Sequence, residues 1–333
     1  MAKEKAEKGE KKDLASTLSE LQKKYGVMSI GRLGDKPEVV VDVISTGSRG
    51  LNKAIGAGGF PKGRIIELWG LEASGKTLIA LSAAAECQRT GGKVAFIDAE
   101  HAFNAGFART LGVDVDNLIY SQPDYGEQAL DMVEVLLENN VVDYIIVDSV
   151  AGLVPQKELE GEMGDSFMGL QARMMGQAMR KLTGPAAKSN TAVVFINQIR
   201  EKIGVAFGDP RTTTGGNALK YYASLRMEVR RVATLKSGDT VIGHRAAVKV
   251  VKNKVGQPHG EAQFNLYYAD HAHPGIDMFG ELVEEAIAKE IIDKAGAWYS
   301  FKGERLGQGE ENTKNFIRGN EKIKAEIIAA LGA

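Results

Sequence analysis

RIIELWGLEASGKTLIALSAAAECQ, residues 64–88, is the stretch of the chain that decides its fold. Its first residues form an apolar, β-branched run typical of a buried strand, and residues 78–89 have the pattern of a helix. Between them, residues 70–77 read GLEASGKT, which matches the phosphate-loop pattern G-x-x-x-x-G-K-[ST]. That pattern also occurs by chance, but here a strand leads into it and a helix leaves it, as a phosphate loop requires. The sequence therefore predicts a P-loop.

The residues of this loop predict how it would hold ATP and Mg²⁺. Its glycines let backbone N–H groups curl around phosphate oxygens, and the helix N-terminus adds the positive end of its dipole. We expect Lys76 to reach the β- and γ-phosphates and Thr77 to ligate Mg²⁺. The predicted ATP-binding loop comprises Gly70, Leu71, Glu72, Ala73, Ser74, Gly75, Lys76, Thr77 and Leu78.

Further apolar runs extend this unit into an alternating strand and helix pattern. We expect strands at residues 94–97, 144–147 and 192–196, and helices at about 127–138 and 169–182. Residues 225–231 and 246–252 indicate additional strands. This alternation predicts an α/β core built on a doubly wound, mostly parallel sheet.

Polar side chains at the ends of these strands indicate chemistry beyond phosphate binding. The strand YIIVD ends in Asp148, which we expect to hold Mg²⁺ through its water shell. The strand before it is followed by Asp98 and Glu100, and either carboxylate is a candidate to activate the attacking water; we favour Glu100. The next strand ends in Asn197 and Gln198, which offer an amide that could hydrogen-bond the γ-phosphate.

Bulk composition excludes several classes of protein. The net charge of −1 gives no sign of a nucleic-acid partner, so any such surface must be local. One cysteine, Cys87, rules out an internal disulfide framework. No apolar run approaches the roughly 18–20 residues of a membrane span, and the charged N-terminus lacks a secretory core. We expect a cytoplasmic protein with no membrane partner.

The chain is expected to have three parts. Residues 1–35 form an N-terminal helix and linker, in which Leu14, Leu18, Leu21 and Tyr25 share one face of a helix that ends near Gly26. That stripe must dock on another surface. Residues 36–274 form the ATPase core, with turns at 56–61, and residues 275–333 form a small C-terminal domain.

Long strings across the chain resemble the RecA family of bacterial recombinases. They include STGSRGLNKAIGAGGFPKGR (45–64), FIDAEHA (96–102), VDSVAGLVP (147–155), ELEGEMGDSFMGLQARMMGQAMRKL (158–182) and TTTGGNALKYYAS (212–224). The resemblance implies a RecA-like P-loop ATPase core with a short N-terminal helical segment and a small α+β C-terminal domain. It also implies a DNA-dependent ATPase that forms filaments on single-stranded DNA and exchanges strands with homologous double-stranded DNA. Activation of self-cleavage of the SOS repressor is a further implied partnership.

Several site roles follow from the resemblance alone. Glu100 matches the family's catalytic glutamate, and Gln198 matches the glutamine that links the γ-phosphate to a DNA-binding loop. Lys252 and Lys254 match lysines that reach the ATP of the adjacent subunit in the filament. The implied catalytic set is therefore Glu100, Lys76, Gln198, Lys252 and Lys254. Phe107 and Tyr268 match rings that pack against adenine.

The resemblance also places two DNA-binding loops, at about residues 160–168 and 200–216. Met168 and Ile203 match apolar residues that wedge between base triplets, while the arginines and the Gly-Gly-Asn run would contact phosphates. The implied DNA-binding residues are Met168, Gly169, Arg173, Arg180, Arg200, Ile203, Gly215, Gly216 and Asn217. In the family the N-terminal helix packs on the neighbouring subunit, which would cover its apolar stripe.

The chain departs from the family pattern at a few positions. Asn104 stands where an acid is common, and Arg211 replaces a typical acidic residue, which makes the second loop more basic. His271 and His273 lie in a short insertion that we interpret as a surface loop. Two other classes share the P-loop core, a ring-shaped helicase or motor and a non-catalytic DNA-coating scaffold. The loop strings and the two lysines argue against both.

Overall fold

The central sheet of the computed structural model is parallel through the strand order β9-β3-β7-β6-β4-β5. The model describes residues 13–26, 29–32, 34, 41–201 and 211–332. The strands of the parallel part are β3 (Ile65–Gly70), β4 (Val94–Asp98), β5 (Ile119–Ser121), β6 (Tyr144–Asp148), β7 (Ala192–Glu201) and β9 (Leu225–Ser237). Beyond β9 the sheet continues antiparallel through β10 (Thr240–Asn253), β11 (Glu261–Tyr267) and β12 (Gly275–Ile276). This arrangement confirms the predicted fold class.

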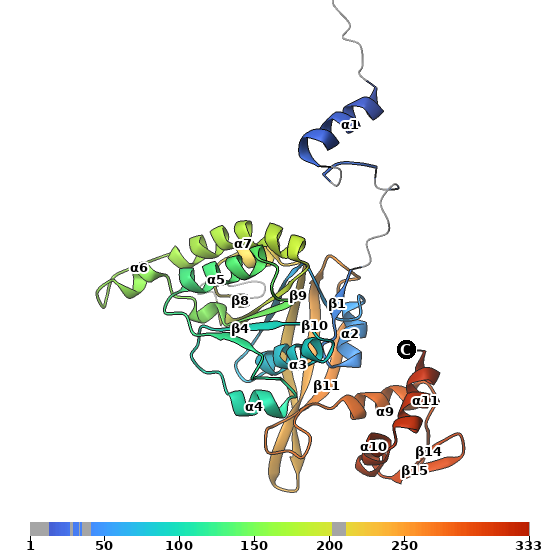
Figure 1. Ribbon diagram of the computed structural model, residues 1–333. Coiled ribbons are helices and arrows are strands. Elements are labelled where there is room, and N and C mark those ends of the chain that lie inside the picture. Colours follow the sequence, from blue (N-terminus) through green and yellow to red (C-terminus); the bar gives the residue numbers. More distant parts are fainter. Residues whose placement is uncertain (1–12, 27–28, 33, 35–40, 202–210, 333) are drawn as a thin grey trace, which may run out of the picture. The chain divides into compact units, whose positions relative to one another are not determined.

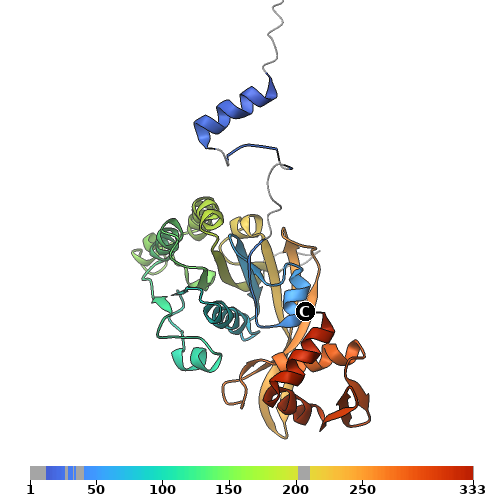
Figure 2. The ribbon, with the colours of Figure 1, turned by 45° about the vertical axis from the view of Figure 1, so that its right-hand side comes forward.

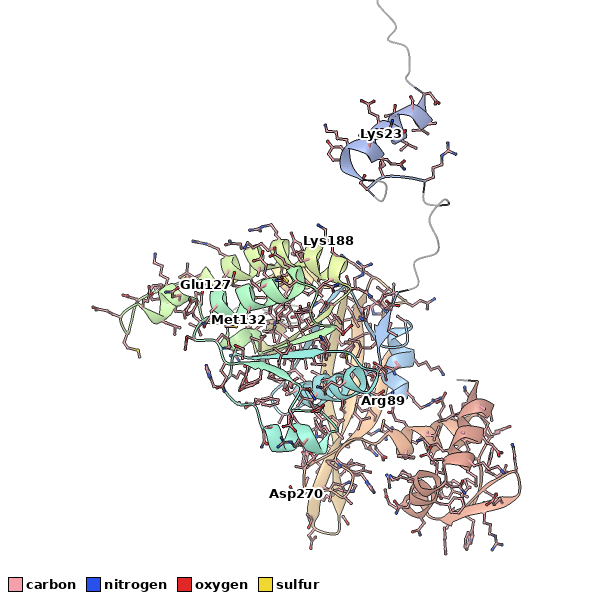
Figure 3. The ribbon with its side chains drawn as sticks, in the orientation of Figure 1. Lys23, Arg89, Glu127, Met132, Lys188 and Asp270 are labelled. Atoms are coloured by element: carbon pink, nitrogen blue, oxygen red, sulfur yellow. The ribbon has the colours of Figure 1, made fainter. Side chains whose placement is uncertain are left out.

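Helices cover both faces of this sheet, as Figures 1 and 2 show. On one face, α3 (Lys76–Arg89) packs on residues such as Ile66, Phe96 and Val194. On the other, α5 (Gly126–Glu138) and α7 (Leu170–Ser189) pack on Ile145 and Phe195. Alternate residues of each strand therefore belong to two separate hydrophobic cores, one on each face of the sheet, as expected of strands that are buried on both sides. Charged side chains such as Glu127 and Lys188 lie on the outer surfaces of α5 and α7 (Figure 3).

Shorter elements connect these layers. They are β1 (Val43–Ile44), α2 (Arg49–Ile55), β2 (Phe60–Pro61), α4 (Ala105–Thr110), η2 (Val150–Gly152), α6 (Gln156–Leu159), β8 (Arg211–Thr213) and α8 (Ala218–Tyr222). The stretch 56–61, expected to be turns, includes β2, which pairs with β1. The sequence pattern missed α2 and α4 because short helices lack several turns of periodicity. It also ended β7 too early, because the polar end of that strand is held by pairing with β8.

The chain divides into two compact units between Val41 and Asp42. The first contains α1 (Leu14–Tyr25), which Asp13 caps by accepting a hydrogen bond from the N–H of Ser16 at 3.3 Å. Gly26 ends this helix with a φ of 97°, a conformation that glycine adopts without a Cβ clash. No residue of α1 is buried, and Leu14 and Tyr25 are 58% and 63% exposed. Leu18 and Leu21 are half-buried, so the predicted apolar stripe has no fully buried residue in the described part of the chain.

The C-terminal part of the second unit has its own small core. It comprises α9 (Met278–Ala288), β13 (Asp293–Ala295), β14 (Trp298–Phe301), β15 (Glu304–Gln308), α10 (Glu310–Gly319) and α11 (Glu321–Leu331). The three strands form an antiparallel sheet, and Phe301, Ile317 and Ile327 are among its buried side chains. A buried ion pair, Lys314 with Asp277 at 3.0 Å, lies beside this core. Among the described residues, no helix has the length and apolar content needed to cross a membrane.

Candidate nucleotide-binding site

The loop between β3 and α3 is held tightly against its surroundings by two glycines. A Cβ on Gly70 would lie 2.2 Å from the carbonyl oxygen of Val229, and one on Gly75 would lie 2.4 Å from Leu266. Gly75 also has a φ of 101° and directly precedes the first residue of α3. These contacts bring the loop to the carboxyl ends of the parallel strands, where ligands bind in open α/β sheets. The loop backbone therefore has the position and the helix terminus that a phosphate group requires.

Lys76 is held at the centre of this loop. Its Nζ donates hydrogen bonds to the carbonyl oxygens of Leu71 at 2.7 Å and Gly70 at 3.2 Å. Burial lowers the pKa of Lys76, while the carboxylates of Asp148 and Glu100 oppose that shift. The side chain is only 8% exposed. An ammonium group that is largely stripped of water interacts strongly with an anion that enters the loop.

Thr77 and Asp148 form the second part of the site. The hydroxyl of Thr77 donates to Oδ2 of Asp148 at 2.7 Å, which joins the start of α3 to the end of β6. The pKa of Asp148 is raised to about 6, chiefly by burial and in part by the nearby charges of Glu100 and Asp98, while the hydrogen bond from Thr77 and the charge of Lys76 oppose the shift. A half-buried hydroxyl and carboxylate are oxygen donors of the kind that Mg²⁺ uses alongside water and phosphate. The donor set present therefore fits a divalent cation that is shared with a nucleotide.

The two carboxylates after β4 have different surroundings. Asp98 is 2% exposed and accepts hydrogen bonds from the N–H of Phe103 at 3.0 Å and from the hydroxyl of Tyr120 at 2.9 Å. Although burial opposes it, these hydrogen bonds lower the pKa of Asp98. Glu100 is exposed and accepts from Gln198 at 2.8 Å and from Ser149. Asp98 is thus occupied by structural contacts, whereas Glu100 faces the P-loop side.

Gln198 and Asn197 are adjacent at the end of β7 and point to opposite faces of the sheet. Gln198 follows the face of Ile196, on the α3 side, where its amide reaches Glu100. Asn197 follows the face of Phe195, is fully buried and donates to Glu67 at 2.9 Å. The pattern of polar strand ends indicated Gln198; the role of Asn197 as its structural counterpart was missed.

Lys252 and Lys254 lie near the end of β10, away from the P-loop of the same chain. Lys252 pairs in register with Arg226 of β9, and Arg226 pairs with Glu67 of β3. That position is three strand residues before Gly70, or about 10 Å. The Nζ of Lys252 donates to the carbonyl oxygens of Lys220 at 2.7 Å and Tyr221 at 2.8 Å. The structure therefore does not bring these lysines to the phosphate loop of their own subunit.

The two rings expected near adenine occupy different environments. Tyr268 lies 5.8 Å, between ring centroids, from buried His244, whose Nε2 is 3.3 Å from the carbonyl oxygen of Ser74. This places Tyr268 close to the P-loop, through a histidine that the sequence pattern did not single out. Phe107 lies on α4 and packs partly buried against the core on the α3 side. Asn104 caps α4 by accepting from the N–H of Phe107 at 2.9 Å, which an acid would do equally well.

The first predicted DNA loop leads into the start of α7. Gly169 caps that helix with a φ of 78°, and Met168 before it is 87% exposed. Arg173 and Arg180 are exposed on the same helix. An exposed apolar side chain beside two free-standing cationic side chains suits a surface that meets a polyanion with apolar bases.

The end of the second loop packs directly on that helix. A Cβ on Gly215 would lie 2.8 Å from Val150, and one on Gly216 would lie 2.7 Å from Ala172 of α7. Asn217 begins α8, and Arg200 pairs with Thr212 in the β7–β8 ribbon. The described ends of both loops are thus adjacent; Ile203 lies outside the described residues.

Two departures from the family pattern have structural explanations. Arg211 forms a 2.5 Å ion pair with Glu228, whose side chain is 6% exposed, so this guanidinium is directed into the sheet. His271 stacks on Tyr267 at 4.0 Å between ring centroids.

The described residues contain no group of three or more His, Cys, Asp or Glu side chains arranged to hold a metal. The surface turn that contains Asp270 is visible in Figure 3.

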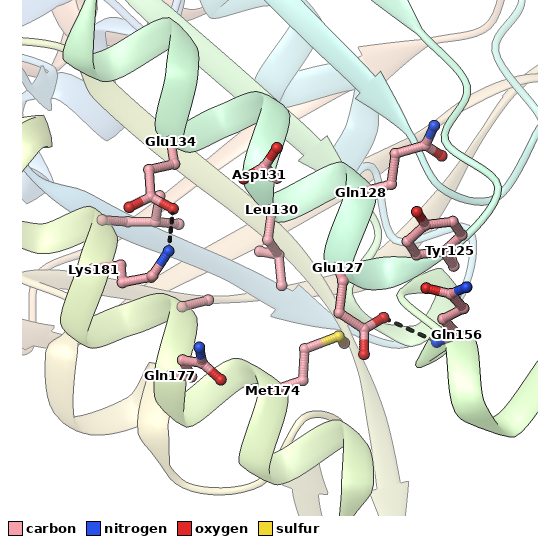
Figure 4. A pocket seen from close by; sticks show the side chains of 12 residues that line it. Tyr125, Glu127, Gln128, Leu130, Asp131, Glu134, Gln156, Met174, Gln177 and Lys181 are labelled. Atoms are coloured by element: carbon pink, nitrogen blue, oxygen red, sulfur yellow. Dashed lines mark hydrogen bonds and ion pairs between the residues drawn. The ribbon is translucent and has the colours of Figure 1, made fainter.

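A separate cavity of about 370 Å³ lies between α5, α6 and α7 (Figure 4). Its wall carries Glu127, Asp131 and the 2.7 Å ion pair of Glu134 with Lys181. None of the P-loop residues lines it. The largely acidic rim is unsuited to a nucleotide, so the loop after β3 remains the candidate nucleotide site.

Comparisons with known proteins agree with this arrangement. Residues 12–273 match the model of the RecA N-terminal domain, and residues 280–332 match that of the RecA C-terminal domain. The protein named RecA from Acinetobacter baylyi is 53% identical over 96% of this chain and 90% of that protein. Those from Campylobacter hominis and Geobacter metallireducens are each 54% identical, over 96% and 95% of this chain and 91% and 92% of their own lengths.

Proposed function

This chain belongs to the RecA family of recombinases, and from that premise we propose a mechanism in which its own residues couple ATP hydrolysis to a DNA filament. Family membership gives a DNA-binding, self-assembling recombinase that binds a nucleotide with a divalent metal. The proposal adds that the nucleotide is ATP, that the metal is Mg²⁺, and that named residues perform each step. A cytoplasmic location stays a prediction from the sequence.

The proposed binding and hydrolysis of ATP are supported by side chains that meet at one place in the structure. The start of α3, the segment after β4, the end of β6 and the strand β7 meet at the carboxyl ends of the parallel strands, where they bring together Lys76, Thr77, Glu100, Asp148 and Gln198. Lys76 would neutralise the β- and γ-phosphates, while Thr77 and Asp148 would hold Mg²⁺, which offsets charge on the phosphates. Glu100 would accept a proton from the attacking water.

Gln198 would respond to the release of phosphate through a change in its hydrogen bonds. Its amide donates to Glu100 at 2.8 Å, and the charge of Glu100 acts on Lys76 of the P-loop, which supports a place for both groups beside a bound γ-phosphate. Hydrolysis would remove one acceptor for that amide and shift it toward Glu100. Gln198 lies within β7, which continues to Glu201 and pairs there with β8 at the second DNA loop, so this change would alter the grip on DNA.

The other half of the site would come from a neighbouring subunit. Lys252 lies about 10 Å along the strand direction from the P-loop of its own chain, and Lys254 follows the end of β10, which supports assigning both lysines to the triphosphate of a second copy. There they would stabilise negative charge in the transition state, as arginine fingers do. ATP would thus bridge subunits and stabilise the filament.

DNA would be held through its backbone at the adjacent ends of the two loops. Arg173, Arg180, Arg200 and the backbone N–H groups near Gly215 would contact phosphates, which position the strand without reading its sequence. Met168 would insert between groups of bases. Base pairing with the incoming homologous duplex would then select the partner. The domain division at about residues 35 and 275 and the partnership with the SOS repressor remain parts of this proposal.

The decisive experiment measures ATP hydrolysis and three-strand exchange in the same samples. We expect single-stranded DNA to stimulate hydrolysis several-fold and homologous, but not unrelated, duplex to be exchanged. Electron microscopy of the same samples distinguishes helical filaments from the closed rings of a motor. Hydrolysis that is indifferent to DNA, or rings in place of filaments, would contradict the proposal.

A further inference from the structure

Glu67 is a fully buried carboxylate beneath the nucleotide site that the proposed mechanism does not use. It lies in the middle of β3, on the sheet face that α7 and α8 cover, and not on the face that carries α3. An isolated ionised carboxylate in such a place is strongly unfavourable, so its partners must be specific. Its two carboxylate oxygens have different partners, Asn197 on one side and Arg226 on the other.

The first direction leads to the nucleotide site and the second DNA loop. Oε1 of Glu67 accepts a hydrogen bond from Nδ2 of Asn197 at 2.9 Å, and the same amide donates to the carbonyl oxygen of Thr214 at 3.1 Å. Oδ1 of Asn197 accepts in turn from the N–H of Gln198 at 2.9 Å. Asn197 therefore holds the backbone of Gln198 and the base of the loop before Gly215 in one hydrogen-bonded group.

The second direction leads to the lysines that would act on a neighbouring subunit. Oε2 of Glu67 accepts from Nε of Arg226, whose guanidinium also lies over the ring of Trp69 at 5.7 Å. Arg226 pairs in register with Lys252. Burial lowers the pKa of Lys252, and the charges of Lys254 and Arg226 lower it further, while Glu67 opposes them. The negative charge of Glu67 therefore acts electrostatically on Lys252, which lies beside Lys254.

We propose that Glu67 is a positioning residue that couples the nucleotide site of its own subunit to the lysines presented to the next subunit. Through Asn197 it fixes Gln198 and Thr214, and through Arg226 it fixes the strand pair that carries Lys252. A movement of Gln198 would then displace both the base of the second DNA loop at Thr214 and the strand pair that carries Lys252. The inference rests on the proposed function, because it assigns the coupling between the groups named there.

The geometry explains why a charged group is suited to this position. A buried carboxylate that loses one partner is destabilised by far more than an exposed one, so the alternatives to its observed contacts are few. Hydrogen bonds to charged groups are also stronger than neutral ones.

The test is Glu67→Gln in the full-length chain. Glutamine keeps an oxygen for Asn197 but turns an amide N–H₂ toward Arg226, so it breaks one of the two links at nearly constant volume. We expect DNA-free hydrolysis and its KM for ATP to stay close to those of the unmodified chain. The ratio of DNA-stimulated to DNA-free kcat should fall about fivefold or more, in the range of ordinary coupling between sites.

Two variants separate coupling from general damage to the fold. Asp277→Asn breaks a comparable buried ion pair, with Lys314, beside the C-terminal core and should lower Tm while leaving the stimulation ratio unchanged. Glu67→Gln with Arg226→Gln restores a neutral pair of amides and should recover part of the ratio. If Glu67→Gln does not fold, Arg226→Lys, which retains the charge but not the guanidinium geometry, should lower the ratio in the same way.

A normal stimulation ratio in Glu67→Gln, or an equal loss in Asp277→Asn, would overturn the inference while leaving the proposed function in place. An unmodified chain whose hydrolysis ignores DNA would instead overturn the proposed function itself, and the coupling with it. The two failures are therefore distinguished by the unmodified chain in the same assay.

Discussion

The P-loop end of β3 and the lysine-bearing end of β10 lie in one sheet but are built differently. At the P-loop, side chains from several elements already meet within one chain, and Thr77 is bonded to Asp148 at 2.7 Å. At the other end, Lys252 is held by carbonyl oxygens of residues 220 and 221 of its own chain. This difference supports the proposal that one subunit supplies the P-loop half of a bridged site and offers its lysines to the next subunit.

Mixing two defective variants is the strongest test of whether the lysines of one subunit act at the P-loop of another. Lys252→Ala should lower DNA-stimulated hydrolysis by about a thousandfold, because a group that stabilises the transition state in trans is lost. Lys76→Ala should abolish hydrolysis at its own P-loop. When the two are mixed, a Lys252→Ala P-loop can meet an intact lysine on a Lys76→Ala neighbour, so activity should partly return. Steady-state hydrolysis on single-stranded DNA measures this, and a mixture no more active than its parts would place the lysines elsewhere.

Glu100→Gln sharpens the assignment of roles at the P-loop end. Hydrolysis should fall about a hundredfold or more, as is typical when a general base is removed, while ATP and DNA binding remain. Asp98→Asn is the matched control: its carboxylate is already bonded to Phe103 and Tyr120, so it should affect folding more than the chemical step. Single-turnover hydrolysis with pre-bound ATP separates the two. The reverse order of losses would make Asp98 the base.

The P-loop end should also carry a cost in stability that depends on pH. Because burial raises the pKa of Asp148 to about 6, its folded state binds a proton more readily than the unfolded chain. Its contribution to stability is therefore greatest below pH 4 and is lost as the pH rises through about 6. Asp148→Asn should remove this penalty, raising the free energy of unfolding at pH 7.5 by up to about 3 kcal/mol. Denaturant unfolding without divalent metal, at pH 7.5 and 5.5, checks it; the gain should shrink at the lower pH.

The smallest expected effect concerns the glycines under the second DNA loop. Gly215→Ala places a Cβ 2.8 Å from Val150 at a φ of 76°, which should cost about 1–3 kcal/mol and weaken binding to single-stranded DNA. Gly184→Ala, in α7 with nothing within 4 Å, should instead stabilise the fold by about 0.5–1 kcal/mol. Thermal unfolding and fluorescence anisotropy on labelled DNA measure both. Equal effects at the two positions would show that the tight packing near Gly215 does not matter for DNA.

Much of the core was predictable because its signals are local. The strand before Gly70, the loop and the helix after it are contiguous, so their pattern is complete within one short segment. The polar ends of later strands likewise indicated Asp148 and Gln198. Elements with weak local periodicity, such as α2, α4 and the ribbon of β7 with β8, were not predicted.

Local patterns in the sequence are enough to predict a phosphate loop, the parallel strands around it, and the residue types at the ends of those strands. The folded arrangement was needed to show that Asn197 and Gln198 point to opposite faces with different partners, and that Glu67 joins Arg226 to Asn197. It alone separated Lys252 from the P-loop of its own chain. The physical reason is that strand order and register are set by packing between residues far apart in the sequence, which no local pattern encodes.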